Sequence, residues 1–191
     1  LGLLAQVVRD DIVQLAVRFI EGNVRAPEWQ RREAALMCFG SIMDGPESQL
    51  LVTLVSQALP TVYEALHDVS VAVKDTAAWT LGRICEFAAD AITPEVQLGP
   101  LIQALLAGLQ EQPRIVTHCC WALINLADNK GSRAHFDEVS PMTTALSPFF
   151  ETLVQQLLLA TDRPNNESNS RTSAYEALAN LIAVPYTPLT P

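Results

Sequence analysis

The stretch VAVKDTAAWTLGRICE, residues 71–86, has the apolar spacing of an amphipathic helix. At 100° per residue, four of its apolar side chains gather on one side of the helix, which is the predicted core side: Val73, Ala77, Leu81 and Ile84. Trp79 lies about 160° from this side on the same wheel. The largest apolar side chain of the stretch therefore points away from the predicted core.

The same pattern recurs along the chain at an interval of 42 residues. Residues 33–42, 75–84 and 117–126 align at this interval, and a fourth copy at 173–181 follows after 55 residues. The extra residues fall in two polar stretches, 128–138 and 162–170, which we predict to be loops. A period of this length indicates an architecture built from stacked repeats.

Each repeat contains two segments with apolar residues three and four positions apart, which predicts helices. The first segments are residues 11–24, 49–66, 96–109 and 142–160, and the second segments are residues 28–43, 70–89, 114–127 and 170–183. Helix pairs with this period predict an all-α fold, a right-handed α-solenoid of HEAT repeats with antiparallel helix pairs.

The expected organisation divides the chain into successive repeats and their connections. It runs as the end of a preceding repeat (1–9), three HEAT repeats (10–45, 46–90 and 94–130), a loop (131–141), a repeat with an internal polar loop (142–184) and an irregular tail (185–191). Because interior repeats lack polar caps, Leu3, Leu4, Val7 and Val8 at one end and Leu178, Leu181 and Ile182 at the other should expose apolar surface. We therefore expect self-association through uncapped ends.

Composition narrows the classes of function. The chain has 191 residues, 12 Lys and Arg against 21 Asp and Glu, and a net charge of −9, which argues against nucleic acid as a ligand and favours a basic partner. No membrane span or signal peptide is predicted. Four cysteines lie in apolar runs without metal-ligand spacing, so we expect buried, reduced thiols: Cys38, Cys85, Cys119 and Cys120.

The side of the second helices that faces away from the core carries a repeated set of side chains. Trp79 and Trp121 occupy equivalent positions, where the other units have Met37 and Glu176. An acid follows seven residues later in three units: Asp44, Glu86 and Asp128. Stacked side by side, these helices would form a wall of aromatic, amide and carboxylate groups, which suits an extended basic peptide through cation–π contacts and charge-assisted hydrogen bonds.

The predicted peptide-binding residues of this wall are Trp79, Trp121, Glu33, Met37, Asp75, Glu86, Asn125, Asp128 and Glu176. One alternative stays open. Trp79 and Trp121 could instead pack between neighbouring repeats, and the acids could form an ordinary solvated face. The sequence contains no catalytic motif, and its three histidines lack ligand partners at helical spacing, so we expect no enzyme, no cofactor and no metal.

Four stretches resemble the middle HEAT repeats of the importin β family of nuclear import receptors. They are PEWQRREAALMCFGSIMDGPE (27–47), VAVKDTAAWTLGRICE (71–86), PRIVTHCCWALINLA (113–127) and TDRPNNESNSRTSAYEAL (161–178). The resemblance covers roughly residues 10–182. Its most specific parts are DTAAWTLGRICE and the segment from TDRP to SAYE. Residues 183–191, AVPYTPLTP, depart from the family pattern.

The resemblance implies a function and partners. Family tryptophans matching Trp79 and Trp121 contact the basic importin-β-binding domain of importin α, and acids of the surrounding wall correspond to Glu33, Asp75, Glu86 and Asp128. Ran and FG-nucleoporins are partners of the full receptor, with the best-known sites outside these residues. The implied location is the cytoplasm, the nucleus and the nuclear pore. A HEAT scaffold of the phosphatase-regulator type, which organises folded partners, remains the alternative.

Overall fold

The computed structural model describes residues 1–131, 144–164 and 166–183, and within these ranges it contains helices and no strand. The first helices of the pairs are α2 (Asp11–Asn23), α4 (Ser48–Ala65), α6 (Gly99–Gly108) and α8 (Phe150–Thr161). The second helices are α3 (Trp29–Ser41), α5 (Val71–Phe87), α7 (Pro113–Gly131) and α9 (Ser168–Ala183). A short helix, α1 (Gly2–Val8), precedes them, and single turns, η1 (Ala89–Ala91), η2 (Pro94–Leu98) and η3 (Ser147–Phe149), lie before α6 and α8.

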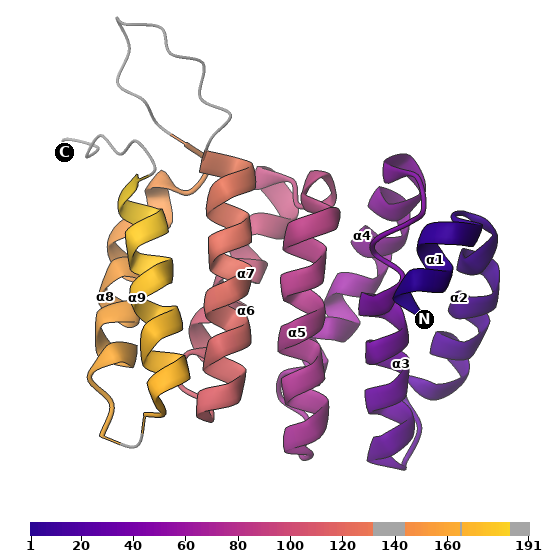
Figure 1. Ribbon diagram of the computed structural model, residues 1–191, viewed down its shortest axis with the longest axis horizontal. Coiled ribbons are helices and arrows are strands. Elements are labelled where there is room, and N and C mark those ends of the chain that lie inside the picture. Colours follow the sequence, from indigo (N-terminus) through magenta and orange to yellow (C-terminus); the bar gives the residue numbers. More distant parts are fainter. Residues whose placement is uncertain (132–143, 165, 184–191) are drawn as a thin grey trace, which may run out of the picture.

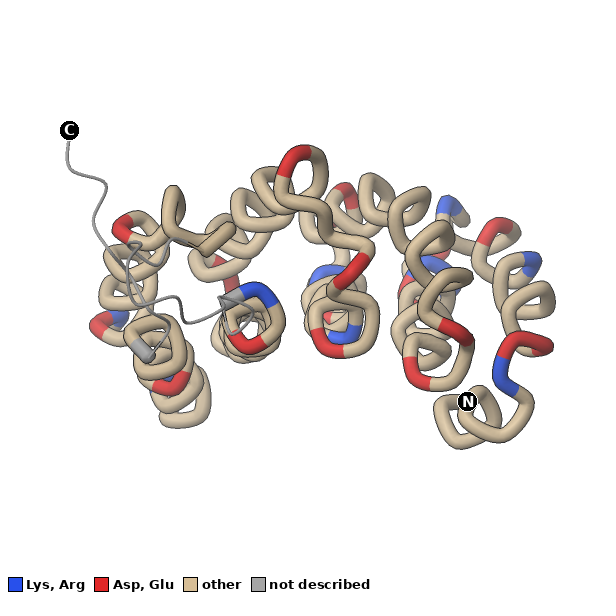
Figure 2. The backbone as a smooth tube through the Cα atoms, turned by 90° about the horizontal axis from the view of Figure 1, so that it is seen from above, with Lys and Arg blue, Asp and Glu red and all other residues tan. Residues whose placement is uncertain are grey.

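The helices are stacked in two rows (Figure 1). Each first helix packs against its own second helix, and the second helices pack against one another in the order α3, α5, α7, α9. Seen from above, the stack is an arch with the second helices on its inner side (Figure 2). We call α3, α5, α7 and α9 the inner row. The predicted solenoid of helix pairs is confirmed.

All eight predicted segments contain the expected helix, and most ends agree within three residues. There are two exceptions. The helix predicted over 114–127 continues to Gly131 as α7, and in the segment predicted over 142–160 the helix α8 begins only at Phe150 after a turn and η3. Pro148 lies within η3. Proline has no N–H to donate and is favoured in the first turn of a helix, which agrees with its place at the start of this helical region, and the predicted helix start at 142 was wrong. Residues 132–143 and 184–191 lie outside the described residues, and with them almost all of the predicted loop 131–141, the start of the last repeat and the tail 185–191.

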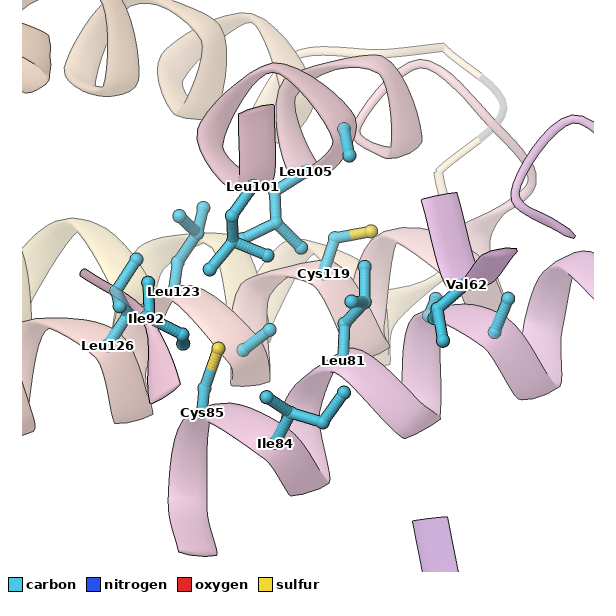
Figure 3. Close-up of a cluster of buried hydrophobic side chains, with 14 of the residues drawn as sticks. Val62, Leu81, Ile84, Cys85, Ile92, Leu101, Leu105, Cys119, Leu123 and Leu126 are labelled. Carbon is cyan, nitrogen blue, oxygen red and sulfur yellow. The ribbon is translucent and has the colours of Figure 1, made fainter. Parts of the chain in front are cut away.

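The core lies between the two rows and runs continuously through the described repeats. Val73, Ala77, Leu81 and Ile84 are each at most 1% exposed, as the helical wheel predicted. Figure 3 shows how Leu81 and Ile84 of α5 meet Leu101 and Leu105 of α6 and Leu123 and Leu126 of α7. Neighbouring repeats therefore share one apolar interior, which no single helix pair could form.

The four cysteines are free, and three of them are part of this core. Burial raises the pKa of the Cys85 and Cys120 thiols to about 12. At neutral pH these groups remain uncharged and behave as small apolar side chains. Among the described helices, none has both the length and the hydropathy to cross a bilayer.

Arginine side chains tie successive helix pairs together at their turns. The Arg32 guanidinium forms a two-point pair with Asp68, with Nε–Oδ2 at 2.7 Å and Nη2–Oδ1 at 2.8 Å, and it also donates to the carbonyls of Ala26 and Pro27. Arg163 donates to the carbonyls of Leu109, Gln110 and Glu111, at 2.8–3.0 Å. These carbonyls follow the end of α6, where intrahelical donors are missing. Arg163 therefore caps α6 from the polar loop of the next pair.

The two ends of the stack agree with the expectation only in part, since Val8 is half-buried and packs against the core. Leu3, Leu4 and Val7 are at least 50% exposed, and so is Ile182. Leu178 and Leu181, however, are only 7% and 1% exposed, because α9 turns them toward α7 and α8. The prediction that these two leucines expose apolar surface was wrong.

The first helices are less closely joined than the inner row. No two neighbouring first helices pack as closely as neighbouring second helices do. Between α2 and α4 lies a hollow of about 380 Å³, whose apolar lining includes Val17, Ile20, Phe39 and Leu54. The inner row thus carries most of the packing between repeats.

Candidate functional site

All nine predicted peptide-binding residues lie on the inner row. Glu33 and Met37 are on α3, Asp75, Trp79 and Glu86 on α5, Trp121, Asn125 and Asp128 on α7, and Glu176 on α9. The row forms the concave side of the arch (Figure 2), so these residues lie on helices that share one curved side of the stack. Their burial differs, and the difference decides what each of them can bind.

Each tryptophan packs against a glycine of the preceding inner helix. A Cβ on Gly40 would lie 2.4 Å from Cζ3 of Trp79, and a Cβ on Gly82 would lie 2.2 Å from Cε3 of Trp121. Real carbon atoms do not approach so closely, so the indole rings occupy space that only glycine leaves free. Both tryptophans are nevertheless partly exposed.

The sequence analysis set two interpretations against each other, a binding wall and packing between repeats, and the geometry is compatible with both. Trp79 and Trp121 pack between neighbouring repeats, and each still presents part of its ring to solvent. The sequence left their packing open, because it did not show what lies opposite them. A ring fixed on a neighbouring backbone loses little rotational freedom when a ligand stacks on it.

The glycines that seat the tryptophans also accept hydrogen bonds from the next inner helix. Arg83 Nε donates to the Gly40 carbonyl at 3.2 Å, and Asn125 Nδ2 lies 3.4 Å from the Gly82 carbonyl oxygen. Arg83 and Asn125 are 42 residues apart, so the contact repeats with the structure. Asn125 thus makes a tie between repeats, and its amide is only partly free for a peptide.

Four of the predicted residues line one hollow of about 640 Å³ on the inner row. Glu33 and Met37 come from α3, and Asp75 and Trp79 from α5. Met37 is 40% exposed, whereas Glu33 is half-buried and accepts a hydrogen bond from Thr76 Oγ1 at 3.1 Å. The opposite wall comes from α7 and includes Arg114 and His118, which the sequence analysis did not identify. We call this space the α5 hollow.

Asp75 is the most buried acid of the predicted set. The residue is 9% exposed, and its Oδ2 lies 2.9 Å from Nε of Arg114. Oδ1 lies 3.5 Å from Nε2 of His118. Burial lowers the pKa of His118, the Asp75 carboxylate opposes this shift, and Arg114 adds to it. Asp75 is therefore a wall of the hollow rather than an exposed acid of the rim.

Two other predicted acids are exposed near the ends of α5 and α7. Partial burial raises the pKa of Glu86, nearby Asp44 acts in the same direction, and Arg83 opposes both. The Arg83 guanidinium lies 3.5 Å from the Glu86 carboxylate and 4.1 Å from the centre of the Phe87 ring. Asp128 is exposed in the last turn of α7. Because carboxylates are unfavourable at the C-terminal ends of helices, these acids gain from a cationic partner.

Glu176, on α9, is exposed and stands where the other units have tryptophan or methionine. Glu86, Trp121, Asn125, Asp128 and Glu176 do not line the α5 hollow. They extend the same surface toward α9.

The contacts that the sequence analysis missed share one spacing between the two residues in contact. Gly40 and Trp79, Gly82 and Trp121, and Asp75 and Arg114 are each 39 positions apart. A second spacing of 43 joins Gly40 to Arg83 and Asp75 to His118. Two residues four apart on one helix thus bracket one residue of the previous helix. Comparing positions at these two offsets would have found Arg114 and His118.

Among residues 1–131, 144–164 and 166–183, no group of three or more His, Cys, Asp or Glu side chains is arranged to hold a metal ion. The polar groups of the α5 hollow are a carboxylate pair, an imidazole and a guanidinium, together with one indole face. Such a set can accept a cation and its aliphatic stem.

Comparison with known proteins gives consistent matches along the chain. The family model described as "Importin subunit beta-1-like, TPR repeats" matches residues 100–187, and one described as "HEAT-like repeat" matches residues 29–84. Importin subunit beta-1 of Schizosaccharomyces pombe is 48% identical over 183 residues, which are 95% of this chain and 20% of that relative.

Two solved structures are also similar. The Kap95:Nup1 complex matches with a TM-score of 0.87 and 38% identity, over 96% of this chain and 20% of that one. A crystal structure of importin beta matches with a TM-score of 0.89 and 35% identity, over 97% and 21%. The chain thus spans about a fifth of the length of these relatives.

Proposed function

Because the chain belongs to the importin β family, we propose that its inner row binds an extended basic peptide, namely the importin-β-binding domain of importin α or a basic cargo signal. The observation that carries this proposal is the pair of tryptophans, partly exposed and fixed on Gly40 and Gly82 in equivalent positions. Two such rings, one repeat apart, form matching stacking surfaces along one wall.

The chemistry of the inner row suits lysine and arginine side chains. A cation over an indole face gains about 0.5–2 kcal/mol, depending on how far it is desolvated. The apolar stem of the same side chain can pack on Trp79 and Met37, while its charge reaches Glu33 or Asp75. Glu86, Asp128 and Glu176 continue the acidic surface, and the net charge of −9 attracts a basic chain from a distance.

The wider role follows from the family. We infer that the chain is part of a receptor that carries proteins between cytoplasm and nucleus through the nuclear pore, without catalysis. The Kap95 relative is described in complex with Nup1, and we extend nucleoporin and Ran binding to the full-length receptor rather than to these residues. Membership of the importin β family weighs against the alternative of a phosphatase-regulator scaffold, which requires no pair of tryptophans.

The test is a titration of a fluorescein-labelled basic peptide, followed by fluorescence anisotropy at several salt concentrations. We expect binding that weakens with salt, and no binding of an acidic peptide of equal length. Reversing Glu86 and Asp128 to Lys should slow association and reduce its salt dependence. Reversing Glu21 and Glu64, exposed acids on α2 and α4, gives the same change in net charge and should affect binding less. Equal effects of the two pairs would show attraction by net charge alone and contradict a site on the inner row.

The tryptophans need a different control. Since both pack on glycine, Trp79→Ala or Trp121→Ala should lower stability as well as peptide affinity. Affinity must therefore be measured under conditions where circular dichroism shows the variant fully folded. A folded double variant with the affinity of the parent chain would overturn the proposal.

A further inference from the structure

Asp75 is a carboxylate that is nine-tenths buried beside the α5 hollow and has unused bonding capacity. Its Oδ1 accepts no hydrogen bond from the residues that the structure describes. His118 Nε2 is 3.5 Å from this oxygen, too far for a good hydrogen bond. A buried carboxylate oxygen without a donor is costly, so a donor that reaches it gains more than one at an exposed site.

Arg114 contacts only one of the two oxygens of this carboxylate. Its Nε lies 2.9 Å from Oδ2, whereas its side chain is 80% exposed. The Arg32–Asp68 pair shows the alternative geometry within the same chain, with two parallel contacts of 2.7 and 2.8 Å. An exposed pair with a single contact is weak compared with a two-point pair in a protected site. The structure therefore holds Asp75 in an incomplete ion pair with a side chain of its own.

The α5 hollow, which both Asp75 and Arg114 line, gives an incoming side chain a route to this carboxylate once Arg114 moves away. Trp79 is four residues further along α5 and shares the helix face of Asp75, and both line the hollow. A guanidinium that enters from the hollow has the planar fork needed to reach both carboxylate oxygens, and its stem lies near the indole. A lysine ammonium is a single point and cannot make the two-point contact.

We propose that Arg114 is an internal occupant of an arginine subsite formed by Asp75 and Trp79, and that an arginine side chain of a bound peptide displaces it. This inference rests on the proposed peptide-binding function and adds its regulation and its preference for arginine over lysine. In the free chain Arg114 neutralises the buried acid. In the bound chain its exposed side chain swings into solvent.

The test uses Arg114→Gln and a fluorescein-labelled oligoarginine peptide, with an oligolysine peptide of the same length. Arg18→Gln, at an exposed position on α2, is the matched control for the change in net charge. Removing the competitor should tighten oligoarginine binding about two- to fivefold relative to Arg18→Gln, the range expected for an exposed ion pair. The affinity for oligolysine should increase less.

The variant Asp75→Asn tests whether the gain in affinity for oligoarginine depends on the Asp75 carboxylate. In the Asp75→Asn background, Arg114→Gln should no longer change affinity, because its target is absent. If Arg114→Gln binds oligoarginine no tighter than Arg18→Gln, or if the gain survives in Asp75→Asn, Arg114 is not an internal occupant of this subsite. A parent chain that binds neither peptide would instead refute the proposed function together with this inference.

Discussion

Replacing Gly82 by alanine tests whether the seat under Trp121 is required. The new Cβ would lie 2.2 Å from Cε3 and 2.3 Å from Cζ3 of the indole. Ordinary contacts between carbon atoms are about 3.5–4.0 Å, so the ring or the helix must move by more than about 1 Å. Overpacking of this kind costs about 1–3 kcal/mol. Replacing a helical glycine gains about 0.5–1 kcal/mol by itself, so we expect a net loss of about 1–2 kcal/mol in the free energy of unfolding.

The chain provides a matched control within α2. Gly22 is exposed, and a Cβ there would meet nothing within 4 Å. Gly22→Ala should therefore raise the free energy of unfolding by about 0.5–1 kcal/mol. Both variants are compared with the parent by urea denaturation, followed by far-ultraviolet circular dichroism. The opposite signs expected for the same substitution isolate the effect of the indole.

The same substitution in a second variant tests whether the indole causes the loss of stability. In Trp121→Ala the ring is absent, so adding Gly82→Ala should then be neutral or stabilising. If Gly82→Ala stabilises the parent as much as Gly22→Ala does, the tight contact does not limit the packing. If its cost persists without the indole, another contact is responsible. In either case the seat of Trp121 would have to be reconsidered.

Three further predictions concern other parts of the chain. Because the pKa of His118 is lowered in the folded chain, the unfolded chain binds a proton at higher pH than the folded chain does. The free energy of unfolding should therefore fall as the pH drops through 6.5. The variant His118→Asn should reduce this pH dependence, which a pH series of urea titrations measures. Arg163→Ala should lower the free energy of unfolding by about 2–3 kcal/mol, because it removes charge-assisted hydrogen bonds to three carbonyls. Arg163→Lys should restore only part of this loss. An alanine variant as stable as the parent would contradict the capping role. The exposed Leu3 and Val7 should promote self-association, so replacing both with Glu should lower the mean mass in sedimentation, and a strictly monomeric parent at high concentration would contradict this.

The helices and their stacking could be predicted from the sequence because apolar periodicity is a local property. Val73, Ala77 and Leu81 face the core simply because they share one side of α5. The interval of 42 residues then gives the repetition of the pairs. Helix α8 begins later than predicted, at Phe150, after a turn and the short helix η3 that contains Pro148.

The site could be predicted only in part, because a wheel shows the direction of a side chain and not what lies opposite it. Trp79 and Asp75 lie on the same side of α5, yet the first is partly exposed and the second is buried. The difference comes from α7, which brings Arg114 and His118 to Asp75. The period identifies positions that repeat, whereas the offsets of 39 and 43 identify positions that touch. Those offsets depend on how adjacent helices are rotated and shifted, which a single helix does not encode.

The unequal packing of the two helix rows determines how the arch deforms. Its inner row is joined by the tryptophan–glycine contacts and by hydrogen bonds to backbone carbonyls, whereas a hollow separates α2 from α4 on the outer row. Bending therefore follows the mechanics of a beam with one stiff edge. The neutral axis lies close to the inner edge, and the strain falls on the compliant outer edge. We expect the spacing of Trp79 and Trp121 to be preserved while the outer helices spread or close, so that a change of curvature would leave both rings in register with the proposed peptide.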